Sequence, residues 1–312
     1  MGELPQRVKI REVGPRDGFQ NEPETIDTFD KVRLIDQLGR TGLRRIEVTS
    51  FVRPDVIPQL ADAAAVLEAI VVPDDVALSV LVPNERGLDR ALEHRDRFHE
   101  VSVFLSASET HNRKNVNRSV EESLAGLRLV LGRARDAGLR CEAVIATSFG
   151  CPYEGVVAGE RVAEIARELR DAGAQEIGFG DTTGMANPRQ VRELFPAWRE
   201  ALGDDVELTA HFHNTRGQGL ANVLAALDVG VDSFESSFGE LGGCPVPAGA
   251  TGNVATEDVV SMLEEMGVQT GIDLPALVVA TGMVRDVLGR PLGSHVATAG
   301  PVDWSGGAPT SR

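Results

Sequence analysis

Cysteine is scarce in this sequence, with only Cys141, Cys151 and Cys244 among 312 residues. An odd number of cysteines without a Cys-x-x-Cys spacing does not indicate a disulfide framework. Free thiols are typical of proteins that reside in a reducing compartment. The sequence therefore predicts a cytoplasmic protein, in which Cys141, inside an apolar run, is a buried thiol.

Long apolar runs and a targeting segment are also missing. No run approaches the roughly 18 apolar residues of a membrane-spanning helix. Residues 1–8 contain neither the apolar centre of a secretion signal nor an amphipathic pattern rich in Arg and Ser. Gln6 stands where a myristoylation signal has Ser or Thr. We expect no association with a membrane.

Positive charge is limited, because 31 Lys and Arg residues face 47 Asp and Glu residues and give a formal net charge of −16 at pH 7. Nucleic acids and anionic membranes are polyanions, so this balance excludes a general binder of either. An anionic small molecule needs only a local cluster of donors and stays allowed. Hydrophobic residues make up 42% of the chain, which is enough for the core of one large domain.

Eight apolar runs of strand length recur at intervals of roughly 23 to 40 residues, the length of one strand–helix unit. The runs are Val8–Val13, Arg45–Ser50, Ala77–Val82, Glu100–Leu105, Arg140–Thr147, Glu176–Gly180, Val206–Phe212 and Asp232–Ser236. Helical periodicity lies between them, as in Thr28–Arg40, Val120–Asp136, Gly159–Asp171 and Gln218–Asp228. Gly138, Gly173 and Gly230 follow polar last turns, where glycine readily ends a helix.

Eight such units predict an α/β fold whose parallel strands close into a ring, the (β/α)8 TIM barrel. The alternative is an open, doubly wound sheet, but no Gly-x-Gly-x-x-Gly fingerprint follows the first run, which weakens a dinucleotide-binding version of it. The pattern predicts Thr256–Gly267 as the last barrel helix and Leu274–Leu288 as an additional helix. Residues 1–288 then form one domain, and residues 289–312, rich in Gly, Ser and Pro, form a mobile tail.

The carboxyl ends of the strands carry the functional site in a TIM barrel. His211 and His213 lie two positions apart near the end of the seventh run, so both side chains share one face of a strand. Asp17 follows the first run, and two imidazoles with a carboxylate suit a divalent cation. The alternative is that both histidines fill the barrel interior as hydrogen-bonded rings.

Two further carboxylates occupy comparable positions. Glu47 lies between Ile46 and Val48 on an apolar run and is expected to point into the barrel. A carboxylate there needs a partner or becomes protonated, and Arg16 is the nearest candidate. Asp181, after the sixth run, is either a site residue or the N-terminal cap of the next helix.

A glycine-rich segment, residues 238–253, follows the last run and is expected to move and to approach a ligand closely. Cys244 in this segment is either a reactive thiol or incidental to a rigid turn. Asn253 is either a helix cap or an oxygen donor to the metal. Residues 111–118, after the fourth run, form a loop with a local basic cluster, which is either a binding surface or merely solvated.

Motifs spread from about Val8 to Ala280 resemble the hydroxymethylglutaryl-CoA lyase family, whose members are metal-dependent lyases on a TIM barrel. The motifs are Val13–Glu22, Glu47–Phe51, Lys114–Ser119, Gly150–Gly155, Gly180–Thr182, the His211-x-His213 pair, Gly242–Pro245 and Gly252–Glu257. They occur in the family's order. The resemblance implies retro-Claisen cleavage of 3-hydroxy-3-methylglutaryl-CoA to acetyl-CoA and acetoacetate, with Mg²⁺ or Mn²⁺ as cofactor.

The resemblance also implies roles for individual residues. The metal ligands would be Asp17, His211, His213 and Asn253. Arg16, positioned by Glu47, would stabilise the enolate of the thioester. Cys244 would protonate the enolate carbon, and Asp17 or His211 would accept the hydroxyl proton. The catalytic set is therefore Arg16, Asp17, Glu47, His211 and Cys244.

The expected partner is an acyl-CoA thioester, and the chain is expected to form a homo-oligomer, with a dimer favoured. Residues that would contact the substrate are Arg16, Gln20, Ser50, Asn115, Asp181 and Thr182. By the same resemblance, the loop of residues 111–118 would line the path of coenzyme A.

Four residues depart from the family pattern, namely Gly178, Thr183, Asn214 and Arg216. None of them belongs to the metal set. Arg216, however, adds a positive charge that could bind a different acyl group, so citramalyl-CoA and isohexenylglutaryl-CoA are alternative substrates. A condensing acyltransferase is a weaker alternative, because such enzymes usually carry a further C-terminal domain. A non-catalytic barrel is weaker still, because a scaffold has no need for the combined catalytic set.

Overall fold

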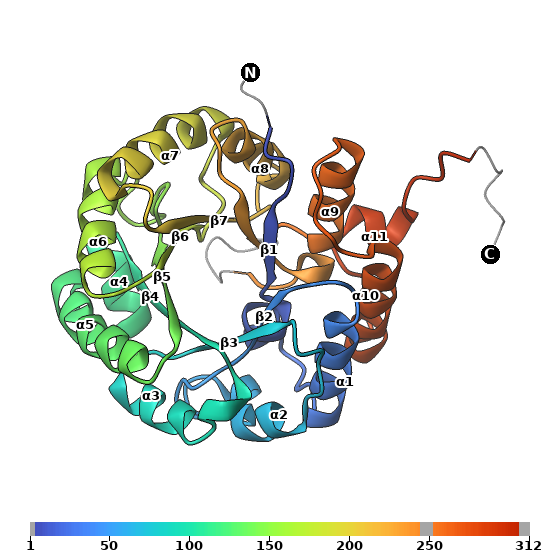
Figure 1. The fold of residues 1–312 in the computed structure, drawn as a ribbon, viewed down its shortest axis with the longest axis horizontal. Coiled ribbons are helices and arrows are strands. Elements are labelled where there is room, and N and C mark those ends of the chain that lie inside the picture. The colour runs from blue at the N-terminus through green and yellow to red at the C-terminus, as the bar shows by residue number, and fades with distance from the viewer. Residues whose placement is uncertain (1–3, 244–251, 306–312) are drawn as a thin grey trace.

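The computed structural model describes residues 4–243 and 252–305, and it contains a barrel of eight parallel strands surrounded by helices (Figure 1). The strands are β1 (Lys9–Glu12), β2 (Arg45–Ser50), β3 (Ala77–Leu81), β4 (Glu100–Ser106), β5 (Arg140–Ala146), β6 (Glu176–Asp181), β7 (Glu207–Phe212) and β8 (Ser233–Ser236). They pair in chain order, and pairing of β1 with β8 closes the ring. The predicted (β/α)8 barrel is confirmed, and the closing pair excludes an open sheet.

The helices around the barrel follow the predicted strand–helix alternation. They are α1 (Thr28–Gly39), α2 (Ala63–Ala69), α3 (Glu85–Leu92), α4 (Glu109–Val116), α5 (Val120–Asp136), α6 (Gly159–Asp171), α7 (Pro188–Leu202), α8 (Gly219–Leu227), α9 (Thr256–Glu265), α10 (Leu274–Leu288) and α11 (His295–Ala299). The bounds of α5, α6 and α10 are those predicted. Within residues 4–243 and 252–305, no helix has both the length and the apolar character needed to cross a membrane.

Helix ends are encoded locally. Helix α5 begins with a capping box, in which Ser119 Oγ accepts from Glu122 N and the Glu122 carboxylate accepts from Ser119 N. The same helix is followed by Gly138 at φ +72°, in the left-handed region that glycine adopts without strain. Gly173 after α6 and Gly230 after α8 also have positive φ, so the predicted glycine stops are found.

Two predicted irregular segments contain helices. The basic segment after β4 was expected as a loop, but it forms α4, whose first turn is capped by Ser108 Oγ accepting from His111 N. The expected tail begins with ordered structure that includes α11. Ser294 Oγ caps α11 and donates to Asp258, which also accepts from His295 N and Val296 N. The composition rich in Gly, Ser and Pro concealed this short helix, because its anchor is a carboxylate on α9.

The interior of the barrel is charged at the amino-terminal ends of the strands. Arg11 on β1 is 1% exposed and contacts four carboxylates, which are Glu100, Glu142, Glu176 and Glu235. Arg45 and Arg140 bind the same group of carboxylates. Buried charges are tolerated only when they are paired in this way. The apolar core therefore lies between the strands and the helices, where Phe179 stacks on Trp198 with ring centroids 4.1 Å apart.

Candidate active site

Asp17, His211 and His213 come together at the carboxyl ends of the strands. One ligand atom from each lies within 4.8 Å of the others. Asp17 belongs to a single π-helical turn, η1 (Gly14–Gly18), that continues β1 and in which Arg16 N and Asp17 N both donate to Val13 O. His211 lies on β7, and His213 pairs with Asn253 in an isolated bridge just beyond it. The predicted convergence of these three side chains is found.

A carboxylate fixes the ring of His211. Its Nδ1 atom lies 2.9 Å from Glu235 Oε2, so Nε2 is left for another contact. Burial lowers the pKa of His211, but the hydrogen bond and charge of Glu235, with the charge of Asp17, outweigh it and raise the pKa overall. Glu235 was not predicted as a site residue. Its signal was a carboxylate inside an apolar strand, the same signal that drew attention to Glu47.

His213 and Asn253 present buried polar atoms without partners. His213 Nδ1 and Asn253 Oδ1 are both buried and accept no hydrogen bond among the residues that the structure describes. Burial and then the charge of His211 lower the pKa of His213 to about 3, so the ring is neutral and able to donate a lone pair. Asn253 does not cap α9, whose N-cap is Ala255. Instead Asn253 Nδ2 donates to Asp17 Oδ2 at 2.8 Å and to Leu241 O at 3.0 Å.

Arg16 lies between two carboxylates. Its Nε donates to Glu47 Oε2 and its Nη1 to Asp17 Oδ1, the latter at 2.6 Å. Glu47 is fully buried, so the predicted partnership of Glu47 with Arg16 is found. Burial raises the pKa of Asp17, but Arg16 and then His211 outweigh it and lower the pKa to about 2. Asp17 is therefore ionised and available to a cation.

Asp181 is not a cap of the helix that follows it. Its Oδ1 accepts from Met185 N at 2.7 Å and Ala186 N at 2.9 Å, whereas Asn187 caps α7. Asp181 Oδ2 is buried and has no hydrogen-bond partner in the described structure. Burial raises the pKa of Asp181 to about 7, despite the two backbone hydrogen bonds. Its other oxygen is therefore available to a ligand.

The remaining predicted residues differ in how closely they approach this cluster. Gln20 Nε2 donates to Asp17 Oδ1 at 3.1 Å, which places Gln20 beside the site. Ser50 Oγ and Thr182 Oγ1 each accept from a backbone N–H near a strand end. Asn115 is exposed on α4, and no contact in the described part of the chain joins it to the cluster. Cys244 lies outside the described residues.

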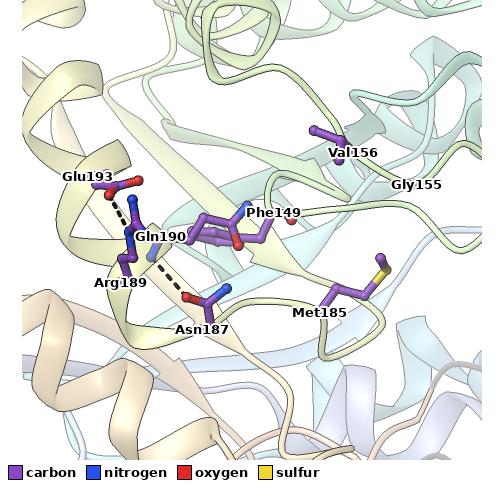
Figure 2. Close-up of a pocket in the computed structure, with 8 residues that line it drawn as sticks. All are labelled: Phe149, Gly155, Val156, Met185, Asn187, Arg189, Gln190 and Glu193. Atoms are coloured by element: carbon purple, nitrogen blue, oxygen red, sulfur yellow. Dashed lines mark hydrogen bonds and ion pairs between the residues drawn. The ribbon is translucent and has the colours of Figure 1, made fainter.

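A separate cavity of about 430 Å³ lies between the segment after β5 and the start of α7 (Figure 2). Its walls include Phe149, Val156 and Met185, with the Arg189–Glu193 ion pair at one side (Figure 2). Of the predicted catalytic and metal-binding residues that the structure describes, none lines this cavity. The chemistry that the sequence points to therefore belongs to the cluster around Asp17.

Comparison with known proteins agrees with this assignment. The model of the HMGL-like family matches residues 7–284. A hydroxymethylglutaryl-CoA lyase of Bacillus subtilis is 47% identical over 291 residues, which cover 93% of this chain and 96% of the relative. A 3-hydroxy-3-isohexenylglutaryl-CoA/hydroxymethylglutaryl-CoA lyase of Pseudomonas aeruginosa is 44% identical over 299 residues, covering 95% of this chain and 98% of the relative.

The solved structures show the same likeness. An HMG-CoA lyase from A. baumannii, in complex with coenzyme A and 3-methylmalate, aligns over 100% of both chains with a TM-score of 0.92 and 39% identity. The family that the motifs resemble is thus confirmed by sequence and by fold. The chain belongs to the HMGL-like family.

Proposed function

We propose that this protein is a divalent-metal-dependent carbon–carbon lyase that cleaves 3-hydroxy-3-methylglutaryl-CoA to acetyl-CoA and acetoacetate. The observation that carries the proposal is the convergence of Asp17, His211 and His213 within 4.8 Å of one another. The names of the relatives from Bacillus subtilis and Pseudomonas aeruginosa support the reaction and the substrate class.

The donor set fits a metal ion. It combines an ionised carboxylate, two imidazoles and an amide, and two of its buried atoms, His213 Nδ1 and Asn253 Oδ1, have no hydrogen-bond partner among the described residues. Asp17, His211, His213 and Asn253 would therefore hold the ion, and mixed oxygen and nitrogen ligands suit Mg²⁺ or Mn²⁺. When bound, a divalent cation at this position would orient the substrate and lower the pKa of its hydroxyl group.

Arg16 supplies charge stabilisation. Its guanidinium is held on one side by Glu47 and on the other by Asp17, so its orientation is fixed before substrate binds. Cleavage of the C2–C3 bond leaves negative charge on the thioester oxygen as the enolate forms. A preorganised cation stabilises that charge without reorganising, and this is the role proposed for Arg16.

Two proton transfers complete the reaction. The substrate hydroxyl loses its proton to Asp17 or His211, whose ligand atoms lie within 4.8 Å of each other. The enolate carbon gains a proton from Cys244 in the glycine-rich segment. These roles stay predictions, as do the substrate contacts of Gln20, Ser50, Asn115, Asp181 and Thr182.

The acyl group is the finer part of the proposal. Arg216, one of the departures from the family pattern, donates from Nη1 to Thr183 O and Gly184 O, both at 2.7 Å. Arg216 therefore connects the segment after β7 with the segment after β6. These contacts give its guanidinium partners within the protein, so its presence does not require a substrate with an additional carboxylate. We retain 3-hydroxy-3-methylglutaryl-CoA as the first substrate. Isohexenylglutaryl-CoA is the second, because the Pseudomonas relative carries both names.

A panel of 3-hydroxy-acyl-CoA thioesters tests the function, with release of acetyl-CoA as the readout. Activity should disappear with EDTA and return with Mg²⁺ or Mn²⁺, because the metal ion binds such a site reversibly. The absence of acetyl-CoA release from every thioester would contradict the lyase assignment. Undiminished activity after EDTA treatment would contradict the metal site. Dimer formation and a cytoplasmic location stay predictions.

A further inference from the structure

Glu235 connects the proposed metal site to the charged interior of the barrel. It lies on β8, and its side chain is 2% exposed. Oε1 accepts from Arg11 Nη1 at 3.0 Å, and Oε2 lies 2.9 Å from His211 Nδ1. Each oxygen of one buried carboxylate therefore contacts a different partner, one below the site and one in it.

We propose that Glu235, held by Arg11, is the positioning residue that sets the orientation and the tautomer of His211. A carboxylate at Nδ1 requires a proton on that nitrogen, which leaves the lone pair of Nε2 for the metal ion. This inference rests on the proposed function, because it concerns how a ligand of the proposed ion is held.

Arg11 makes Glu235 rigid. The guanidinium contacts carboxylates from four strands, namely Glu100 on β4, Glu142 on β5, Glu176 on β6 and Glu235 on β8. A planar group with partners on several sides cannot turn without breaking several ion pairs at once. Glu235 is thus fixed through strands that contribute no ligand to the proposed ion.

His213 provides the contrast. Its Nδ1 has no hydrogen-bond partner in the part of the chain that the structure describes. Among the described residues, a carboxylate therefore contacts Nδ1 of His211 but not Nδ1 of His213. Loss of Glu235 should free the ring of His211 and should also remove a negative charge next to the proposed cation.

The test compares Glu235→Gln with Glu142→Gln. Both substitutions neutralise a buried carboxylate that binds Arg11 Nη1, but Glu142 contacts Ser102 and not His211. Binding of Mn²⁺ to the full chain is measured without substrate, from the EPR signal of free Mn²⁺. Glu235→Gln should weaken Mn²⁺ binding by about 10- to 100-fold, the usual effect of removing a group that orients a metal ligand. Glu142→Gln should bind Mn²⁺ like the wild type.

Equal losses of Mn²⁺ affinity in the two variants would overturn the proposal, because they would show that only the buried charge matters. Failure of the wild type to bind Mn²⁺ would instead overturn the proposed function. A measurement on the wild type covers the case in which Glu235→Gln does not fold. NMR signals of ¹⁵N-labelled histidine are recorded with Mg²⁺ bound, and a trace of Mn²⁺ is added to identify the rings near the metal by the broadening of their signals. At least one of these rings should carry its proton on Nδ1. Protons on Nε2 in all broadened rings would refute the role of Glu235.

Discussion

Replacement of Arg16 by Gln separates charge stabilisation from substrate binding. The substitution removes a guanidinium that is 11% exposed and leaves two carboxylates, Glu47 and Asp17, without their shared partner. Loss of one preorganised donor of this kind costs about 10²- to 10³-fold in kcat, or roughly 2.7–4 kcal/mol. We therefore expect kcat to fall by that factor and KM to change much less, because the contact is made mainly with the transition state.

The same variant has a predictable effect on stability. Glu47 is fully buried, and breaking a buried ion pair costs at most about 3–5 kcal/mol, less if the orphaned carboxyl becomes protonated. Burial already raises the pKa of Glu47, which makes that protonation accessible. The double variant Arg16→Gln with Glu47→Gln should thus recover much of the lost unfolding free energy in urea, while kcat stays low.

The assay follows acetyl-CoA release over a range of substrate concentrations, together with Mn²⁺ binding. Mn²⁺ affinity should not fall in Arg16→Gln, because the substitution takes a positive charge away from Asp17. A rise in KM with unchanged kcat would mean that Arg16 only holds the substrate. Recovery of kcat in the double variant would mean that the single variant had failed through instability.

Two further substitutions test other parts of the site, and a third tests the pH dependence of stability. His213→Ala should weaken Mn²⁺ binding, and an intact metal stoichiometry by atomic absorption would refute its role as a ligand. Cys244→Ala should lower turnover and leave Mn²⁺ binding unchanged; wild-type turnover would remove its role as an acid. Burial raises the pKa of Glu12 from 4.5 to about 8. Between these two pH values the native state keeps a proton that the unfolded state has lost, so the free energy of unfolding should fall as the pH rises through this range. Glu12→Gln should flatten this fall, which urea unfolding across the window would measure.

The fold was predictable because its signals are local and repeated. The strand-length runs and the glycine stops after α5, α6 and α8 each reflect short-range physical chemistry. Barrel closure then followed from the number of units, and with it the expectation that Asp17 and the two histidines meet at one end. The order of the strands alone was thus enough to predict that these side chains, which are far apart in sequence, lie close together.

Several features were not predictable, because they depend on contacts across the barrel. The partner of Asp181 is the backbone of the next loop and not a helix end, and the pattern of residues does not distinguish the two. Helix α4 looked like a basic loop because it presents almost no apolar face. Glu235 carries the same sequence signal as Glu47, but its role was missed because that role depends on Arg11 and His211, two residues on other strands.

Buried ion pairs inside the barrel connect the amino-terminal ends of the strands with the proposed site at their carboxyl ends. Three arginines, Arg11, Arg45 and Arg140, pair there with four carboxylates, Glu100, Glu142, Glu176 and Glu235. Glu235 also contacts a proposed metal ligand, because its second oxygen lies 2.9 Å from His211 Nδ1. The orientation of His211 therefore depends on ion pairs made by strands that contribute no ligand to the proposed ion. Glu142 belongs to the same ion pairs without contacting His211, so the effect of a substitution on Mn²⁺ affinity should depend on this contact and not on the total buried charge.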